Sequence, residues 1–229
     1  MFEQLKDAVC RANRELARRG LVTLTWGNAS GISPDRTRVA IKPSGVAYDD
    51  LTAERMVVVD LEGNVVEGRL RPSSDTPTHL LLYRSFQQIG GVAHTHSPRA
   101  TAFAQARLEI PCLGTTHADH FSGPVPVTRP LTAEEVEEDY ERNTGKVIIE
   151  RFVDLDPRAM PAVLAAGHGP FCWGRGPLDA VATAAALEAV AAMALATRLL
   201  RPESPLLEDY LRDKHFRRKQ GPGASYGQK

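Results

Sequence analysis

Short runs of β-branched residues alternate along the chain with longer segments in which apolar residues recur at helical spacing. This alternation limits the possible folds most strongly. Residues 56–68 place two β-branched runs around an Asp-Leu-Glu-Gly turn, which predicts a β-hairpin. Other predicted strands, at 92–96 and 170–173, are followed by helical segments instead. Because hairpins and helical crossovers occur together, we expect one α/β domain with a mixed sheet covered by helices on both faces.

Several helices can be located from their end signals. Thr76-Pro77 is typical of a helix start, and Thr132 with Glu135 forms a capping-box pair that opens an acidic helix to about Arg142. Pro177 starts a long helix that continues to about residue 200. Val125 and Val127 predict a further strand. Residues 146–153 are ambiguous between helix and strand, and the composition of residues 213–229 predicts a loose, polar tail.

Charge and cysteine content exclude several classes of protein. The 229 residues carry 28 basic and 28 acidic side chains, so there is no chain-wide basic field for nucleic acid or for an anionic membrane surface. Three cysteines cannot all pair, which favours a reducing compartment. The N-terminal segment has no apolar run typical of a signal peptide, and charged residues interrupt the apolar segment 177–200. We therefore expect a cytoplasmic protein with no membrane or nucleic-acid partner.

The histidines carry the strongest chemical signal. His94 and His96 stand two apart on a predicted strand, so both imidazoles should project from one face, where they can reach one ion. His168 follows another predicted strand and lies between two glycines, which allow a tight backbone that directs the ring into a cavity. Asp75 stands at a predicted helix start, either as a helix cap or as a fourth metal ligand. Imidazole suits several divalent metals, so the pattern does not name the ion.

A second group of residues is suited to an anion. A hydroxyl pair at a predicted helix start, a lysine at a strand end followed by a glycine turn, and an asparagine before another turn together resemble a phosphate site. Each of these features alone is weak evidence for a phosphate site. These residues are Asn28, Lys42, Ser44, Gly45, Ser73 and Ser74.

Seven segments in order along nearly the whole chain resemble the class II aldolase and epimerase family. They are residues 25–31, 41–46, 71–79, 94–98, 115–121, 165–169 and 225–228. Within that family the chain resembles enzymes that epimerise C4 of a pentulose 5-phosphate during arabinose catabolism. The resemblance implies a three-layer α/β/α fold around a mostly antiparallel sheet, and a homotetramer with active sites at subunit boundaries. It also implies that residues 213–229 complete a neighbouring subunit's active site.

The resemblance assigns roles to individual residues. It implies that His94, His96 and His168, with Asp75, hold one divalent metal ion per subunit, usually zinc, with manganese or cobalt as alternatives. The six residues of the anion group match the family's phosphate-binding positions. Asp119 and Tyr226 match its acid/base pair, supplied by the neighbouring subunit, and three further residues match positions that support this pair: Thr115, Glu141 and His215.

The implied reaction breaks and re-forms the bond between C3 and C4 of the substrate, since the proton on C4 is not acidic. The main alternative is a class II sugar-phosphate aldolase of the fuculose- or rhamnulose-phosphate type. Aldolases of the family carry a longer Glu at the position of Asp75, so Asp75 favours the epimerase. A non-catalytic protein that has kept the scaffold is a third possibility, against which the complete set of Asn28, Lys42, Asp119 and Tyr226 argues.

Overall fold

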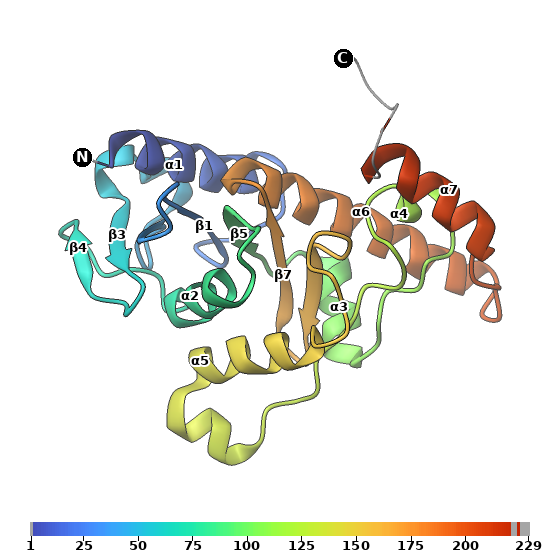
Figure 1. Ribbon diagram of the computed structural model, residues 1–229. Helices are drawn as coiled ribbons and strands as arrows, with labels where there is room; N and C mark the ends of the chain where they lie inside the picture. The colour runs from blue at the N-terminus through green and yellow to red at the C-terminus, as the bar shows by residue number, and fades with distance from the viewer. Residues whose placement is uncertain (1, 221–223, 225–229) are drawn as a thin grey trace.

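A seven-stranded sheet forms the centre of the protein, in the order β4-β3-β2-β1-β5-β7-β6 (Figure 1). The computed structural model describes residues 2–220 and residue 224. Each pair of neighbouring strands is antiparallel, and a parallel contact occurs in this part of the chain only as an isolated bridge between Val127 and Leu164. The strands are β1 (Asn28–Ile32), β2 (Arg38–Ile41), β3 (Val57–Asp60), β4 (Val65–Glu67), β5 (Gly91–His94), β6 (Ala162–Ala165) and β7 (Gly169–Gly174).

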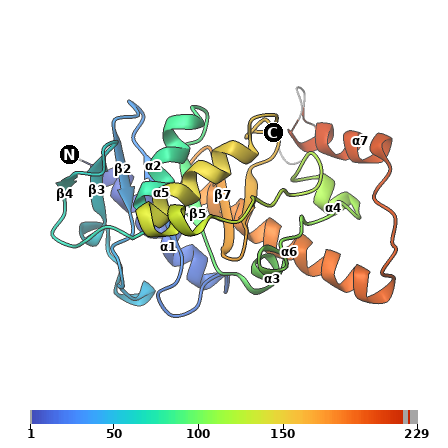
Figure 2. The ribbon, with the colours of Figure 1, turned by 90° about the horizontal axis from the view of Figure 1, so that it is seen from below.

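Helices cover both faces of this sheet, as Figures 1 and 2 show, so the expected three-layer α/β/α fold is confirmed. On one side lie α1 and the long α6, and on the other lie α2 and α5. The helices are α1 (Glu3–Arg18), α2 (Thr76–Ser85), α3 (Pro98–Ala106), α4 (Thr115–Ala118), α5 (Ala133–Arg151), α6 (Pro177–Leu200) and α7 (Asp209–Gln220), with 3-10 turns at Tyr48–Asp50 and Ala53–Arg55.

The register of the three central strands places functional residues side by side. Asn28 of β1 lies opposite His94 of β5, and His94 lies opposite Phe171 of β7. The His94 ring stacks on the Phe171 ring at a centroid distance of 4.2 Å. Since β1, β5 and β7 are buried between the helical layers, this row holds the asparagine and the first histidine in fixed positions.

Helix α6 is long and apolar enough to span a membrane by length and composition alone. In this structure it packs instead on β5, β7, α1 and α3. The side that faces them is formed by small and aliphatic residues: Ala180, Val181, Ala184, Leu187, Val190, Ala191 and Ala194. This packing is that of a core helix in a globular protein, as the interrupting charges predicted.

Helix α5 differs from its prediction because it continues to Arg151 and thereby includes most of the ambiguous segment 146–153. The expected capping box is present, with reciprocal hydrogen bonds between Thr132 and Glu135. A kink at Asp139, whose φ of −165° and ψ of 84° are not helical, divides the helix. The side chain of Asp139 accepts a hydrogen bond from the Arg142 backbone at 3.2 Å, as an N-cap does, so a second helical segment begins at Tyr140.

Two other predictions were wrong. Residues 213–220 are not part of a loose tail but belong to α7, which packs against α4. The polar composition did not indicate this helix, because a helix with a single contact face needs few apolar residues. Val125 and Val127 form isolated bridges rather than a strand of the sheet. Tyr226 and residues 225–228 lie outside the described residues, so the expectation for them is not addressed by this fold.

Candidate metal and anion site

Three imidazoles meet at the end of β5. The ligand nitrogens of His94, His96 and His168 all lie within 4.8 Å of one another, which confirms that these histidines form one cluster. The Nε2 atoms of His94 and His96 are 3.1 Å apart, and the Nδ1 atom of His94 lies 2.9 Å from the Pro170 carbonyl oxygen. Because that carbonyl can only accept, Nδ1 of His94 carries the proton and Nε2 presents a lone pair to the centre of the cluster.

The loop around His168 has the glycine geometry that the sequence predicted. Gly167 has a φ of +74°, a conformation that side-chain-bearing residues rarely adopt. A Cβ on Gly169 would lie 2.8 Å from the Thr95 carbonyl oxygen, so only glycine lets this turn approach the end of β5. The turn between β6 and β7 therefore carries His168 to the other two histidines.

The imidazoles of His96 and His168 are held neutral. Burial, followed by the neighbouring His94 and His96, lowers the pKa of His168 to about 3. Burial and His94 lower the pKa of His96 in the same direction. A neutral imidazole with a free lone pair is the form that binds a metal ion, so the chemistry of this donor set fits a divalent metal.

Asp75 stands at the N-cap of α2, but its side chain makes no capping hydrogen bond. Its Oδ2 instead accepts a hydrogen bond from Nδ2 of Asn28 at 2.6 Å. Burial raises the pKa of this carboxyl, but His94, His79 and the Asn28 amide outweigh burial and leave it lowered. The carboxylate thus lines the cavity and does not cap α2 with a side-chain hydrogen bond, although Asp75 occupies the N-cap position.

Two loops beside the histidines bring the anion group together. Pro43 and Pro72 form an antiparallel bridge, the Ser44 N–H donates to the Arg71 carbonyl at 2.9 Å, and the Ser73 N–H donates to the Lys42 carbonyl at 3.0 Å. These bonds join the turn after β2 to the segment before α2. The glycine turn and the hydroxyl pair, 30 residues apart in sequence, therefore lie next to each other as the sequence predicted.

The Lys42 side chain is only 2 % exposed. Its Nζ lies 3.4 Å from the Pro43 carbonyl oxygen and 5.0 Å from the centroid of the Tyr48 ring. Within residues 2–220 no carboxylate forms an ion pair with it. Burial lowers the pKa of this ammonium, which leaves a buried cation that an anionic ligand would stabilise.

One cavity of about 630 Å³ connects the two groups. Asn28 Oδ1 is buried and has no hydrogen-bond partner among the described residues, so it can accept from a ligand hydroxyl. Two larger depressions, of about 750 and 650 Å³, contain none of the histidines. The lining of the connecting cavity includes Asn28, Lys42, Ser44, Gly45, Ser73, Ser74, Asp75, His94, His96, Tyr140, Glu141 and His168.

Tyr140 was not recognised from the sequence. Its hydroxyl oxygen lies 3.2 Å from Nδ1 of His168, and burial, followed by Asp75 and Glu141, raises its pKa and keeps the phenol protonated. No motif marks this tyrosine, because the contact joins residues 28 apart through a kinked helix. The one available sign was its position directly after Asp139, a residue that favours helix N-caps.

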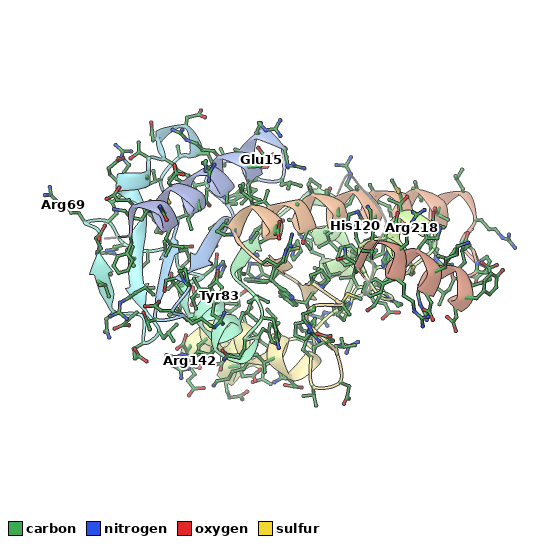
Figure 3. The ribbon with its side chains drawn as sticks, turned by 45° about the horizontal axis from the view of Figure 1, so that its top comes forward. Glu15, Arg69, Tyr83, His120, Arg142 and Arg218 are labelled. Carbon is green, nitrogen blue, oxygen red and sulfur yellow. The ribbon has the colours of Figure 1, made fainter. Side chains whose placement is uncertain are left out.

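The remaining candidate residues lie elsewhere. Asp119, at the end of α4, receives hydrogen bonds from His215 at 3.1 Å and from Arg218 at 3.1 Å, both on α7. Burial raises the pKa of Asp119, but these two partners outweigh it and lower the pKa. Figure 3 places His120 and Arg218 at the same end of the molecule, away from Tyr83 of α2. Asp119, Thr115 and His215 do not line the cavity, whereas Glu141 does.

Comparison with known proteins agrees with this geometry. The profile of the Class II Aldolase and Adducin N-terminal domain matches residues 7–195. The chain is 55% identical over 228 residues to proteins named L-ribulose-5-phosphate 4-epimerase UlaF from Salmonella paratyphi B and from Salmonella typhi, with 100% of both chains covered. A solved structure of an L-fuculose 1-phosphate aldolase superposes with a TM-score of 0.78 at 26% identity, over 93% of this chain and 94% of that one.

The fold is that of an open antiparallel sheet between helical layers, with a three-histidine cluster able to hold a divalent metal at the end of β5. The chain belongs to the class II aldolase family.

Proposed function

We propose that this chain interconverts L-ribulose 5-phosphate and D-xylulose 5-phosphate by epimerisation at C4. The observation that carries the proposal is the cavity in which a three-histidine cluster meets a buried lysine that has no ion-pair partner in residues 2–220. An uncharged sugar would not need that lysine. The full-length relatives named L-ribulose-5-phosphate 4-epimerase support the choice of substrate and reaction.

We assign the metal to His94, His96 and His168, with Asp75 as a fourth ligand or a flanking carboxylate; we propose zinc, with manganese or cobalt as alternatives. When bound, such an ion acts as a Lewis acid that withdraws electron density from the substrate oxygens beside it. The Asn28 amide orients Asp75, and its buried Oδ1 accepts a hydrogen bond from the substrate.

The phosphate is bound at the opposite end of the cavity in this proposal. Lys42 supplies the charge, and Ser44, Gly45, Ser73 and Ser74 supply hydroxyl and backbone donors around it. Holding the phosphate keeps the two-carbon aldehyde in the site after the C3–C4 bond breaks. The aldehyde can then rotate about its anchored end and be attacked on its other face, which inverts C4.

Two proton carriers are needed, because the C4 hydroxyl loses its proton in one epimer and regains it in the other. We propose Asp119 and Tyr226 for these roles, with Thr115, Glu141 and His215 in support. Asp119 does not line the cavity of its own chain, which favours a role in the site of a neighbouring subunit. Exposed apolar side chains near the ends of α6 and α7 are consistent with a homotetramer: Met193, Leu195, Leu199, Leu200 and Tyr210. We place this enzyme in the cytoplasm, in arabinose catabolism.

The test is turnover of L-ribulose 5-phosphate by purified protein together with its metal content. The wild-type protein should form D-xylulose 5-phosphate and contain one divalent ion per chain. His96→Asn should lose the activity and fall well below one ion per chain, because it removes one of three imidazoles. Elemental analysis that finds full occupancy in His96→Asn would contradict the assignment.

The structural similarity to an L-fuculose 1-phosphate aldolase makes a sugar-phosphate aldolase the second candidate. The same assay separates the two. An aldolase releases free aldehyde and three-carbon fragment from its sugar phosphate, whereas an epimerase retains both and shows conversion without accumulated fragments.

A further inference from the structure

The hydroxyl of Tyr140 forms the side-chain hydrogen bond seen at the His168 ring. Tyr140 Oη lies 3.2 Å from Nδ1 of His168, and the two ring centroids are 5.9 Å apart. His94 is held in an equivalent way through its own Nδ1, by the Pro170 carbonyl oxygen at 2.9 Å. In His94 the remaining nitrogen, Nε2, lies 3.1 Å from Nε2 of His96, and in His168 Nε2 is the nitrogen that Tyr140 leaves available for a metal ion.

We infer that Tyr140 is a positioning residue that fixes the orientation of His168 for metal binding through this hydrogen bond. The inference rests on the metal site proposed above. Histidines that ligate metals usually donate their second ring N–H to a partner, and that partner sets both the tautomer and the angle of the ring. Tyr140 is this partner for His168, and the phenol oxygen accepts a hydrogen bond from the Nδ1–H group.

The glycine turn brings His168 to the cluster, and the rotation of its ring is then set by side-chain contacts. His168 lies in the turn between β6 and β7, next to Gly167, which is exposed and has a φ of +74°. The other ring neighbours of His168 are His94 and His96, which belong to the same cluster, and the edge of Phe171 at 6.1 Å. Among the described residues, the hydrogen bond at Nδ1 of His168 comes from Tyr140, so the phenol decides which nitrogen faces the ion.

The kink in α5 places Tyr140 where it can act. Asp139 interrupts the helix and caps a second segment, so Tyr140 begins that segment. The Tyr140 carbonyl accepts a hydrogen bond from Thr144 at 2.9 Å, and the next carbonyl, of Glu141, accepts one from Thr78 of α2. Tyr140 is thus anchored within its helix and, through its neighbour, to α2, whose N-cap is Asp75.

A phenol differs from the carboxylate that often holds a metal-bound histidine. It is neutral, so it fixes the ring without adding negative charge beside the ion. The imidazole remains a weaker electron donor than one paired with a carboxylate, and the ion keeps more of its Lewis acidity. The choice of a tyrosine suits a reaction that builds up negative charge on substrate oxygens.

The test compares Tyr140→Phe with Tyr83→Phe. Both substitutions remove one hydroxyl from a tyrosine that contacts another side chain, but Tyr83 contacts Ser30 and no residue of the histidine cluster. The dissociation constant for Zn²⁺ is measured by competition with a chromophoric chelator. We expect Tyr140→Phe to bind Zn²⁺ about 10- to 100-fold more weakly than wild type and Tyr83→Phe to match wild type.

A second readout does not depend on affinity. With Co²⁺ in place of zinc, the visible absorption bands report the geometry of the ligands, and they should shift in Tyr140→Phe but not in Tyr83→Phe. Thermal unfolding of the metal-free proteins should give the same midpoint for wild type and Tyr140→Phe within a few degrees, which separates a change at the site from a loss of structure.

The outcomes distinguish this inference from the proposed function. If wild type binds Zn²⁺, His96→Asn does not, and Tyr140→Phe matches wild type in both affinity and Co²⁺ spectrum, the role of Tyr140 is wrong and the metal site stands. If wild type binds neither ion, the metal site itself is wrong and the inference fails with it.

Discussion

At the scale of single residues, Lys42 is a buried cation whose charge calls for an anionic partner. A buried ammonium without a carboxylate partner in residues 2–220 is costly unless an anion binds to it. Lys42→Met keeps the length of the side chain and removes the charge. A charge-assisted hydrogen bond contributes about 1.5–3 kcal/mol, so the KM for the sugar phosphate should rise about ten- to a hundredfold.

Metal content in Lys42→Met should stay at the wild-type value, because Lys42 contacts none of the three histidines. Lys146→Met is the matched control, since Lys146 is exposed on α5 and does not line the cavity. Steady-state kinetics in which Lys42→Met and Lys146→Met have the same KM would refute the role of Lys42 in phosphate binding.

The sequence predicted the members of this site better than their contacts. The histidine cluster is confirmed, and so is the approach of Lys42-Pro43-Ser44-Gly45 to Ser73-Ser74, because short motifs with glycine or proline fix local geometry. Asp75 occupies the N-cap position of α2, as a cap would, but its carboxylate accepts a hydrogen bond from Asn28, 47 residues away, which no local pattern predicts. Tyr140 was missed for the same reason: its partner is set by tertiary packing and not by a motif.

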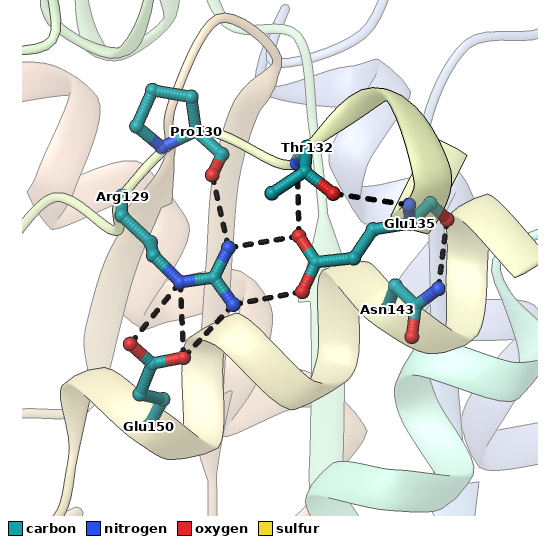
Figure 4. Close-up of polar contacts among 6 residues, drawn as sticks. All are labelled: Arg129, Pro130, Thr132, Glu135, Asn143 and Glu150. Carbon is teal, nitrogen blue, oxygen red and sulfur yellow. Dashed lines mark hydrogen bonds and ion pairs between the residues drawn. The ribbon is translucent and has the colours of Figure 1, made fainter. Parts of the chain in front are cut away.

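At the scale of elements, Arg129 links the two halves of the kinked helix α5. Arg129 donates two hydrogen bonds to Glu135 at 2.8 Å, before the kink, and two to Glu150 at 3.1 Å, after it (Figure 4). Asn143 adds a bond to the Glu135 carbonyl at 2.7 Å, also across the kink. The turn that carries Tyr140 and Glu141 into the cavity lies between these contacts.

We expect Arg129→Gln to loosen the first half of α5 while leaving the rest of the domain stable. Amide hydrogen exchange should become faster in residues 133–139 than in wild type and stay unchanged in residues 143–149, which pack on α2 and include the buried Val147 and Ile148. Arg158→Gln is the control, because Arg158 pairs only locally, with Asp156. Equal exchange at 133–139 in all three proteins would show that Arg129 does not hold the kink.

The same contact predicts a pH dependence. Arg129, followed by the Thr132 backbone, lowers the pKa of Glu135 from 4.5 to about 2 in the folded state. A carboxyl with a lowered folded pKa stabilises the fold above its unfolded pKa, and that stabilisation is lost as pH falls. The difference in exchange between wild type and Arg129→Gln should therefore be full at pH 6 and decrease between pH 4.5 and about 2.

Elements with end signals were predicted well, and elements that depend on a packing partner were not. The hairpin at 56–68, the helix from Pro177 and the strands on either side of His168 follow from local turn and cap chemistry, and all are present. The segments 146–151 and 213–220 have no clear periodicity, and they are helical in a structure where α2 packs against α5 and α4 packs against α7. Such partners are distant in sequence, so composition alone cannot reveal them.

At the scale of the whole molecule, the metal and anion cavity and the proposed acid/base residue Asp119 lie apart within one chain. The cavity lies beside β1, β5 and α2, whereas Asp119 is held by α4 and α7 at the far end of α6 (Figures 1 and 2). His215 and Arg218 keep its carboxylate ionised and fixed in place. A fixed carboxylate that does not line the histidine cavity of its own chain is suited to act on the site of the next subunit.

This arrangement predicts complementation between two inactive variants. Asp119→Asn alone should be nearly inactive because its sites lack the acid/base carboxylate, and His96→Asn alone should be inactive because its sites lack metal. In a mixed oligomer, some boundaries combine an intact metal site from the Asp119→Asn chain with an intact Asp119 from the His96→Asn chain. The two variants, unfolded and refolded together with metal, should therefore regain a substantial fraction of wild-type activity.

The control is the same refolding carried out on each variant alone, followed by mixing without unfolding, which forms no hybrid boundaries and should leave the activity low. Native mass spectrometry identifies the hybrids, because the two substitutions give the chains different masses. Random mixing also sets the expected activity. With equal amounts of the two chains, about one boundary in four pairs a working metal site with a working carboxylate. If boundaries act independently, the recovered activity should approach about a quarter of the wild-type activity. Hybrids that are confirmed by mass and remain as inactive as either parent would place Asp119 in the site of its own chain.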